Sequence, residues 1–229
     1  VTYNDQPEET NLFDYRDARV AFSYKHALSP TNTGILSLTG RDYQTDNPNR
    51  NDATGYGITA GFARQWSETT QLRALIGVEQ TEIDDPSPEQ EDLDPNFVTE
   101  VSLLRQLETT RLLAQYRQRI TASGRGELRR RSEVNLSLAR DLNDKISAGI
   151  GFRAYTIDAL EGSGKEQDYV QLRGQFVWRM TSALSIQATY IHRLLDRRDI
   201  GESANANHLT LWLSYQPTPR GSLRPATVL

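Results

Sequence analysis

The sequence predicts an all-β fold, a transmembrane up-and-down antiparallel β-barrel with about 12 strands visible in this chain. Three observations lead to this prediction. Apolar and polar residues alternate with a period of two, as they do in a strand that has one apolar face. The alternating segments run for about 9–12 residues, whereas strands of soluble proteins most often have about 5–6 and a bilayer-spanning strand needs about 9–11. Short turns and long polar loops alternate between the segments.

The period-two alternation is clearest in the second half of the chain. In the segment 168–180, Val170, Leu172 and Phe176 have one parity, and Gln171 and Arg173 have the other. The same pattern along the chain predicts 11 strands, and residues 1–3 add the stub of a further one. The predicted strands cover residues 18–28, 34–44, 56–66, 71–82, 97–107, 111–122, 130–142, 145–157, 168–180, 183–195 and 205–216.

Polar connections of two lengths separate these strands. The short turns are Ser29–Asn32, Ser67–Thr70, Glu108–Thr110, Asn143–Asp144 and Thr181–Ser182. The long loops are residues 5–16, 45–55, 84–96, 123–129, 160–167 and 196–204. Because the two classes alternate strictly, each hairpin is short at one end of the sheet and long at the other. Membrane β-barrels have this asymmetry, with short periplasmic turns and longer extracellular loops.

The hairpins recur at a regular spacing. The last apolar residues before the short turns are Leu28, Trp66, Leu107, Leu142 and Met180, which lie 38, 41, 35 and 38 residues apart. A propeller blade repeats at a similar length, but it contains four short strands. A β-sandwich seldom has strands of this length in up-and-down order, and a soluble barrel of this many strands is too wide for a filled core. These soluble folds are the alternatives to the membrane barrel.

Charged and amphipathic residues recur near the short turns on the apolar face. Two residues before each apolar residue that precedes a short turn lie His26, Arg64, Arg105, Arg140 and Trp178. A ring of charge is costly in a soluble core, whereas Arg can extend to lipid headgroups and Trp is frequent at membrane interfaces. With Trp66, these are the predicted membrane-interface residues; the alternative is coincidence among five short alignments.

If the apolar face contacts lipid, the opposite face lines a lumen in which basic residues outnumber acidic ones. The predicted lumen-lining residues are Arg73, Arg117, Arg119, Arg153, Arg173, Arg179, Arg193, Glu79, Glu100 and Glu133. The same parity includes Arg19, Lys25, Arg41, Arg111, Arg131, Lys145 and Asp141. One dominant charge sign sets the selectivity of a pore, so we expect a path that favours anionic or polyhydroxylated solutes. The alternative is that inward Arg and Glu pair across strands and fill the barrel.

The composition excludes several other function classes. The 229 residues include 26 Lys and Arg, 30 Asp and Glu and no Cys, so disulfides, thiolate metal ligands and Cys nucleophiles are excluded. The longest apolar runs, 74–78 and 148–152, are too short for a transmembrane helix. No Gly-rich phosphate loop and no zinc-ligand spacing is present. We therefore predict no enzymatic activity, no cofactor, no metal site and no nucleic-acid partner.

Three weaker candidates for chemistry have simpler explanations. Ser185 or Ser214 could form a Ser/His pair with His192, but both serines have the inward parity and His192 the outward one. The acidic loop 84–96 could bind calcium, although solvated charge explains it more simply. The run 129–131 of three arginines is predicted to form a collar at a strand entrance.

The hairpin pattern resembles Gram-negative outer-membrane β-barrels, and more narrowly the β-barrel porins found with exopolysaccharide and exosortase systems. It includes Trp66-Ser67-Glu68-Thr69-Thr70-Gln71-Leu72 and Leu107-Glu108-Thr109-Thr110-Arg111-Leu112. The resemblance covers nearly the whole chain and implies a bacterial outer-membrane location. It also implies lipid or lipopolysaccharide, polysaccharide and periplasmic export proteins as partners.

The two ends of the chain depart from the pattern of such barrels. They commonly end in an aromatic residue, whereas here Tyr215 closes the last strand of a barrel domain, residues 1–216, and residues 217–229 form a C-terminal extension. The first residues lack the features of a signal peptide, and the start within a strand stub suggests an N-terminal truncation.

Two functions remain open at this point. The leading one is a passive outer-membrane conduit for polysaccharide or anionic solutes. The alternative is a structural or docking barrel whose lumen is plugged by its own side chains or by a partner.

Overall fold

The computed structural model describes residues 2–4, 14–46, 52–83, 95–122, 128–160, 167–198 and 201–216. Within these ranges no helix is long and apolar enough to cross a membrane. The strands are β1 (Thr2–Asn4), β2 (Tyr15–Ser29), β3 (Asn32–Thr45), β4 (Ala53–Ser67), β5 (Thr70–Ile83), β6 (Asn96–Gln106), β7 (Thr110–Ala122), β8 (Leu128–Asp141), β9 (Ile146–Ala159), β10 (Gln167–Arg179), β11 (Leu184–Arg197) and β12 (Glu202–Tyr215).

These strands form one 12-stranded sheet whose spatial order follows the chain from β1 to β12. Every neighbouring pair whose register is described is antiparallel, so the predicted all-β, up-and-down architecture is confirmed. The predicted stub at residues 1–3 is β1. The largest differences are at three strand starts, because β2, β4 and β12 begin at residues 15, 53 and 202 rather than at 18, 56 and 205. Alternation continues through these polar positions, which the prediction assigned to long loops.

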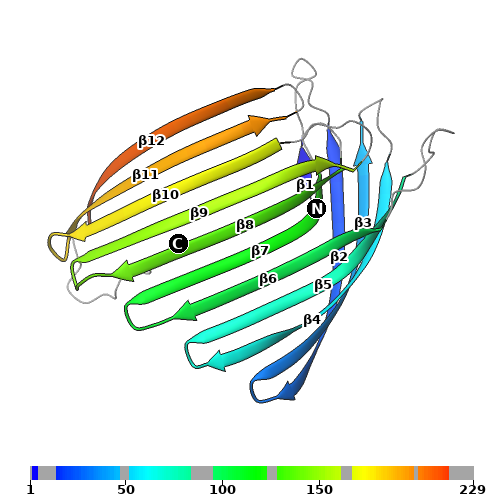
Figure 1. Ribbon diagram of the computed structural model, residues 1–229, viewed down its shortest axis with the longest axis horizontal. Coiled ribbons are helices and arrows are strands. Elements are labelled where there is room, and N and C mark those ends of the chain that lie inside the picture. The colour runs from blue at the N-terminus through cyan, green and yellow to red at the C-terminus, as the bar shows by residue number, and fades with distance from the viewer. Residues whose placement is uncertain are drawn as a thin grey trace.

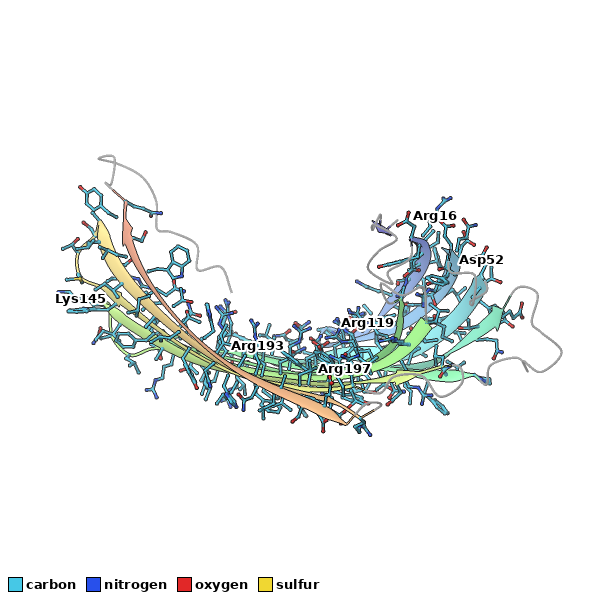
Figure 2. The ribbon with its side chains drawn as sticks, turned by 90° about the horizontal axis from the view of Figure 1, so that it is seen from above. Arg16, Asp52, Arg119, Lys145, Arg193 and Arg197 are labelled. Atoms are coloured by element: carbon cyan, nitrogen blue, oxygen red, sulfur yellow. The ribbon has the colours of Figure 1, made fainter. Side chains whose placement is uncertain are left out.

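The sheet is strongly curved. Figure 1 shows long strands lying side by side across it, and Figure 2 shows the sheet from above as a crescent with both ends turned toward the same side. β1 and β12 are the edges, and no pairing within the described ranges joins them. The described part of the chain is therefore an open trough with a concave and a convex face. A closed barrel would need a further pairing between these edges.

The convex face is apolar and exposed. Phe22, Leu38, Ile58 and Val78 are successive cross-strand partners from β2 to β5, so their side chains share one face. Their exposed fractions run from 67% for Phe22 to 38% for Val78. Soluble monomers rarely expose apolar patches of more than a few hundred Å². The surroundings that suit this face are therefore lipid rather than water.

Two glycines mark a close approach of β4 to β5. A Cβ atom on Gly61 would collide with the carbonyl oxygen of Ala74, and one on Gly77 would collide with that of Ile58. Both glycines have the parity of the concave face. A strand glycine often marks a tight bend or a close backbone contact, and such positions give a sheet its curvature. We infer that the absence of side chains here lets the N-terminal hairpins curl over the trough.

The small buried core lies at the long-loop end of this curled region. Tyr43 at the end of β3 and Ala53 at the start of β4 cluster with Ile120 of β7 and Leu128 of β8. Since β3 and β4 pair with neither β7 nor β8, this cluster joins strands that the sheet itself does not join. At the same end, Arg19 of β2 contacts the backbone of Ile120 in β7, so β2 and β7 lie close together there.

Candidate functional site

The candidate site is the polar concave face of the trough. The cross-strand register places Arg117 of β7 opposite Glu100 of β6 and Glu133 of β8, so these predicted lumen-lining residues share a face. Arg153 of β9 lies opposite Asn135 and Gln171 on the same face. Figure 2 shows the labelled Arg119 and Arg193 on the concave side. The register therefore shows that these residues share one face, and their position in a lumen stays a prediction.

Two glutamates on this face are each shared between two arginines. Glu100 lies 3.7 Å from Nε of Arg73 and 3.5 Å from Nε of Arg117. Glu133 lies 2.8 Å from Nη2 of Arg131 and 3.0 Å from Nη2 of Arg153. One carboxylate thus balances only half of the positive charge beside it.

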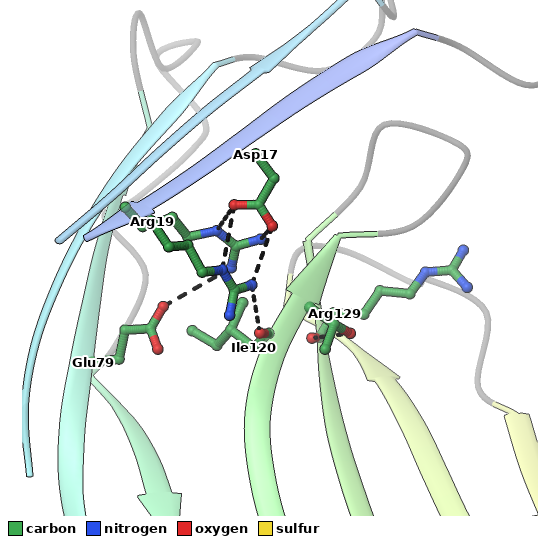
Figure 3. Close-up of polar contacts among 7 residues, drawn as sticks. Asp17, Arg19, Glu79, Ile120 and Arg129 are labelled. Atoms are coloured by element: carbon green, nitrogen blue, oxygen red, sulfur yellow. Dashed lines mark hydrogen bonds and ion pairs between the residues drawn. The ribbon is translucent and has the colours of Figure 1, made fainter. Parts of the chain in front are cut away.

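A third shared carboxylate, Asp17, lies at the curled end of the sheet (Figure 3). Arg41 donates two hydrogen bonds to it, from Nε at 2.9 Å and from Nη2 at 3.0 Å, and Arg19 Nη2 donates a third at 3.2 Å. Nη1 of Arg41 lies 3.9 Å from Glu79, and the Arg41 side chain is only 4% exposed. Arg19 also donates to the backbone carbonyl of Ile120 at 3.1 Å, which ties β2 to β7.

Asp17 is the site residue that the sequence reasoning missed. The predicted loop ended at residue 16 and the predicted strand began at residue 18, so Asp17 was assigned to neither. The available signal was the continued alternation of Tyr15, Asp17 and Arg19, all of the concave parity. Because the inward residues at this end of the strand are as polar as loop residues, the predicted strand started too late.

An aromatic stack orients the arginines around Glu133. The Tyr155 and Tyr169 rings stack with centroids 4.6 Å apart, and the Arg131 guanidinium lies 4.0 Å from the Tyr155 centroid. The Arg153 guanidinium lies 5.9 Å from the same centroid. These contacts and the two ion pairs hold both arginines beside one carboxylate.

Other predicted lumen residues contact no carboxylate of the residues that the structure describes. Among the described residues, Arg119, Arg173 and Arg193 make no ion pair and their guanidinium groups make no hydrogen bond. Arg179 donates only to the backbone carbonyl of Asp144, at 3.3 Å. Pairing of Arg with Glu thus accounts for part of this face and leaves a positive excess.

The predicted interface residues all lie on the convex face near the short turns, and all are exposed. The Arg64 guanidinium lies 5.8 Å from the Trp66 ring centroid, and His26 stacks on Tyr24 at 6.3 Å. Arg105, Arg140 and Trp178 occupy the corresponding ends of β6, β8 and β10. A role at a membrane interface stays a prediction.

The weaker candidates gain no support from the geometry. Ser185 and Ser214 are cross-strand partners, whereas His192 lies on the opposite face and contacts Asn207 Oδ1 at 2.8 Å. Within the described ranges no group of three or more His, Cys, Asp or Glu could hold a metal ion. Most of the acidic loop 84–96 and the extension 217–229 lie outside the described residues.

Comparison with known proteins bears on the fold. No protein-family model matches this chain, and no curated protein matches it. The solved structure of the outer-membrane channel DcaP of Acinetobacter baumannii is similar with a TM-score of 0.57 at 14% identity. That match covers 93% of this chain and 66% of DcaP. This chain thus spans just under two thirds of that channel's length.

Two further outer-membrane proteins match at lower scores. The siderophore receptor PirA of Pseudomonas aeruginosa gives a TM-score of 0.47 at 13% identity, covering 89% of this chain and 39% of PirA. OmpT of Vibrio cholerae gives 0.43 at 11% identity, covering 88% and 82%. At these identities the DcaP match shows the fold alone, which is that of outer-membrane β-barrels.

Proposed function

We propose that this chain forms the wall of a channel in the bacterial outer membrane, with a basic lumen that favours anionic solutes. The observation that carries the proposal is the sharing of carboxylates on the concave face. Glu100 and Glu133 each serve two arginines, and Arg119, Arg173 and Arg193 contact no described carboxylate. Such a surface attracts anions and repels cations.

The convex face supports the membrane location. Its exposed apolar side chains suit the acyl chains, and the exposed Arg64, Arg140 and Trp178 near the short turns suit the headgroup region. Lipid or lipopolysaccharide is thus the proposed partner of this face. With short turns on the periplasmic side, the long loops would face the outside.

The channel can be tested by reversal potentials in planar bilayers at low ionic strength, where screening is weakest. Replacing Arg153, Arg173 and Arg179 together by Gln is expected to shift the reversal potential toward cation preference. The matched control replaces three arginines of the convex face, Arg64, Arg105 and Arg140, by Gln and is expected to leave ion preference unchanged. Absence of conductance, or an equal shift in control and test variants, would contradict the proposal.

The finer part of the proposal is that the solute is a polysaccharide, passed on by periplasmic export proteins. Half-buried amides between the arginines, such as Gln171 and Gln175, would suit polyhydroxylated chains. Anionic and neutral oligosaccharides of equal length can be compared as blockers of the current. Stronger block by the anionic one is expected.

A second candidate is a barrel whose lumen is closed by its own side chains. The bond from Arg19 to the Ile120 carbonyl and the buried cluster around Tyr43 favour it, since both join strands across the trough. This function predicts no conductance in the wild-type protein.

A further inference from the structure

A cavity of about 260 Å³ lies at the curled end of the concave face, between β2 and β7. Its lining residues are Tyr15, Asp17, Arg19, Arg119, Thr121 and Ala122. Since a water occupies about 30 Å³ in the liquid, the cavity has room for a small polyatomic ion with some of its water.

Positive charge is concentrated beside this cavity. Arg119 lies directly opposite Arg131 in the cross-strand register, and Arg117 precedes it on the same face. Arg19 reaches the backbone carbonyl of Ile120, the next residue along β7. Like charges directly opposite one another destabilise a sheet, and Glu133 is paired with Arg131 rather than with Arg119, so an anion beside Arg119 would stabilise this arrangement.

The nearby carboxylates do not balance Arg119. Asp17 already accepts hydrogen bonds from Arg41 and Arg19, and Glu133 accepts them from Arg131 and Arg153. Arg119 itself has no ion pair with a described residue. Its planar guanidinium group carries parallel N–H donors, which suit the oxygens of an oxyanion. The cavity thus has two guanidinium groups and two hydroxyl groups in its lining and one carboxylate that is fully engaged.

We propose that this cavity is a binding site for an oxyanion, the phosphate, sulfate or carboxylate group of a small solute, held by Arg119 with Arg19. The inference rests on the proposed function for its role, because it places a binding step on the path of an anionic solute. The bond from Arg19 to Ile120 orients its guanidinium, and the anion relieves the repulsion between Arg119 and Arg131. Arg119 is the residue on which binding depends most, because Arg19 also serves Asp17.

The test is a titration of folded protein in uncharged maltoside micelles with inorganic phosphate, followed by the ³¹P linewidth. We compare the wild type with Arg119→Gln and with Arg111→Gln, which removes the same charge from the same strand near its short turn. Saturable binding is expected, with roughly a tenfold to hundredfold loss of affinity in Arg119→Gln, the range for a hydrogen bond to a charged group. Arg111→Gln should bind as the wild type does. Because Arg119→Gln removes a like-charge contact, its fold should be retained, which circular dichroism checks.

Absence of saturable binding in the wild type, or an equal loss in both variants, would overturn the site. The micelles contain no phospholipid, so binding in them would show that the site takes free phosphate and does not need a lipid headgroup. Conductance measured separately distinguishes the two proposals. Arg119-dependent binding without conductance leaves the site standing and refutes the channel, whereas conductance without such binding refutes only the site.

Discussion

Replacing Asp17 by Asn should strongly destabilise the curled end of the sheet. The Arg41 side chain is 4% exposed, and its two short contacts, at 2.9 and 3.0 Å, are both to the Asp17 carboxylate. Without that charge, the nearest carboxylate is Glu79, 3.9 Å from Nη1. Removing one partner of a buried ion pair costs about 3–5 kcal/mol, because the other charge stays buried and uncompensated. Asn retains one acceptor oxygen, so we expect a loss of about 3 kcal/mol in the free energy of unfolding.

The assay is urea unfolding of the protein in lipid vesicles, followed by Trp fluorescence. The matched control is Asp168→Asn, since the Asp168–Arg198 pair at 2.9 Å has side chains that are 39% and 45% exposed. An exposed pair contributes about 0–1 kcal/mol, so the control should lose no more than that. A double variant with Asp17→Asn and Arg41→Met should be more stable than Asp17→Asn alone, because it removes a buried charge whose nearest remaining carboxylate is Glu79, at 3.9 Å. Equal losses for Asp17→Asn and Asp168→Asn would refute the reasoning.

Three further predictions concern the sheet and its orientation. Gly61→Ala should prevent folding or markedly lower the urea midpoint of unfolding, because the added Cβ would collide with the Ala74 carbonyl oxygen. Gly174→Ala is the control, since a Cβ there meets open space, and its urea midpoint should change little. Ile150→Arg places a charge on the exposed convex face and should lower the free energy of unfolding by about 2–4 kcal/mol if the site lies near the bilayer midplane. A loss below about 0.5 kcal/mol, measured in vesicles, would place this face in water. A bulky thiol reagent applied to intact cells should not label cysteines introduced at Glu68 or Asn143 in the short turns; labelling there would reverse the proposed topology.

Much of the fold follows from local sequence patterns. Strand order, the short turns and the separation of two faces depend on a period of two and on turn residues, which act over a few neighbouring positions. That is why the pairs of Arg117 with Glu100 and of Arg153 with Glu133 lie on the predicted face. Strand ends were harder to place, because inward residues such as Asp17 are as polar as a loop.

Only the tertiary structure decided which inward charges are balanced and where the trough contacts itself. Parity placed Arg119 and Arg153 on one face, but it could not show that Arg153 reaches Glu133 while Arg119 meets no described carboxylate. The bond from Arg19 to the Ile120 carbonyl joins residues 101 positions apart, on strands that do not pair. Such contacts depend on how sharply the sheet bends at positions such as Gly61. The bend is a sum of small backbone rotations over many strands, and no local pattern of residues encodes it.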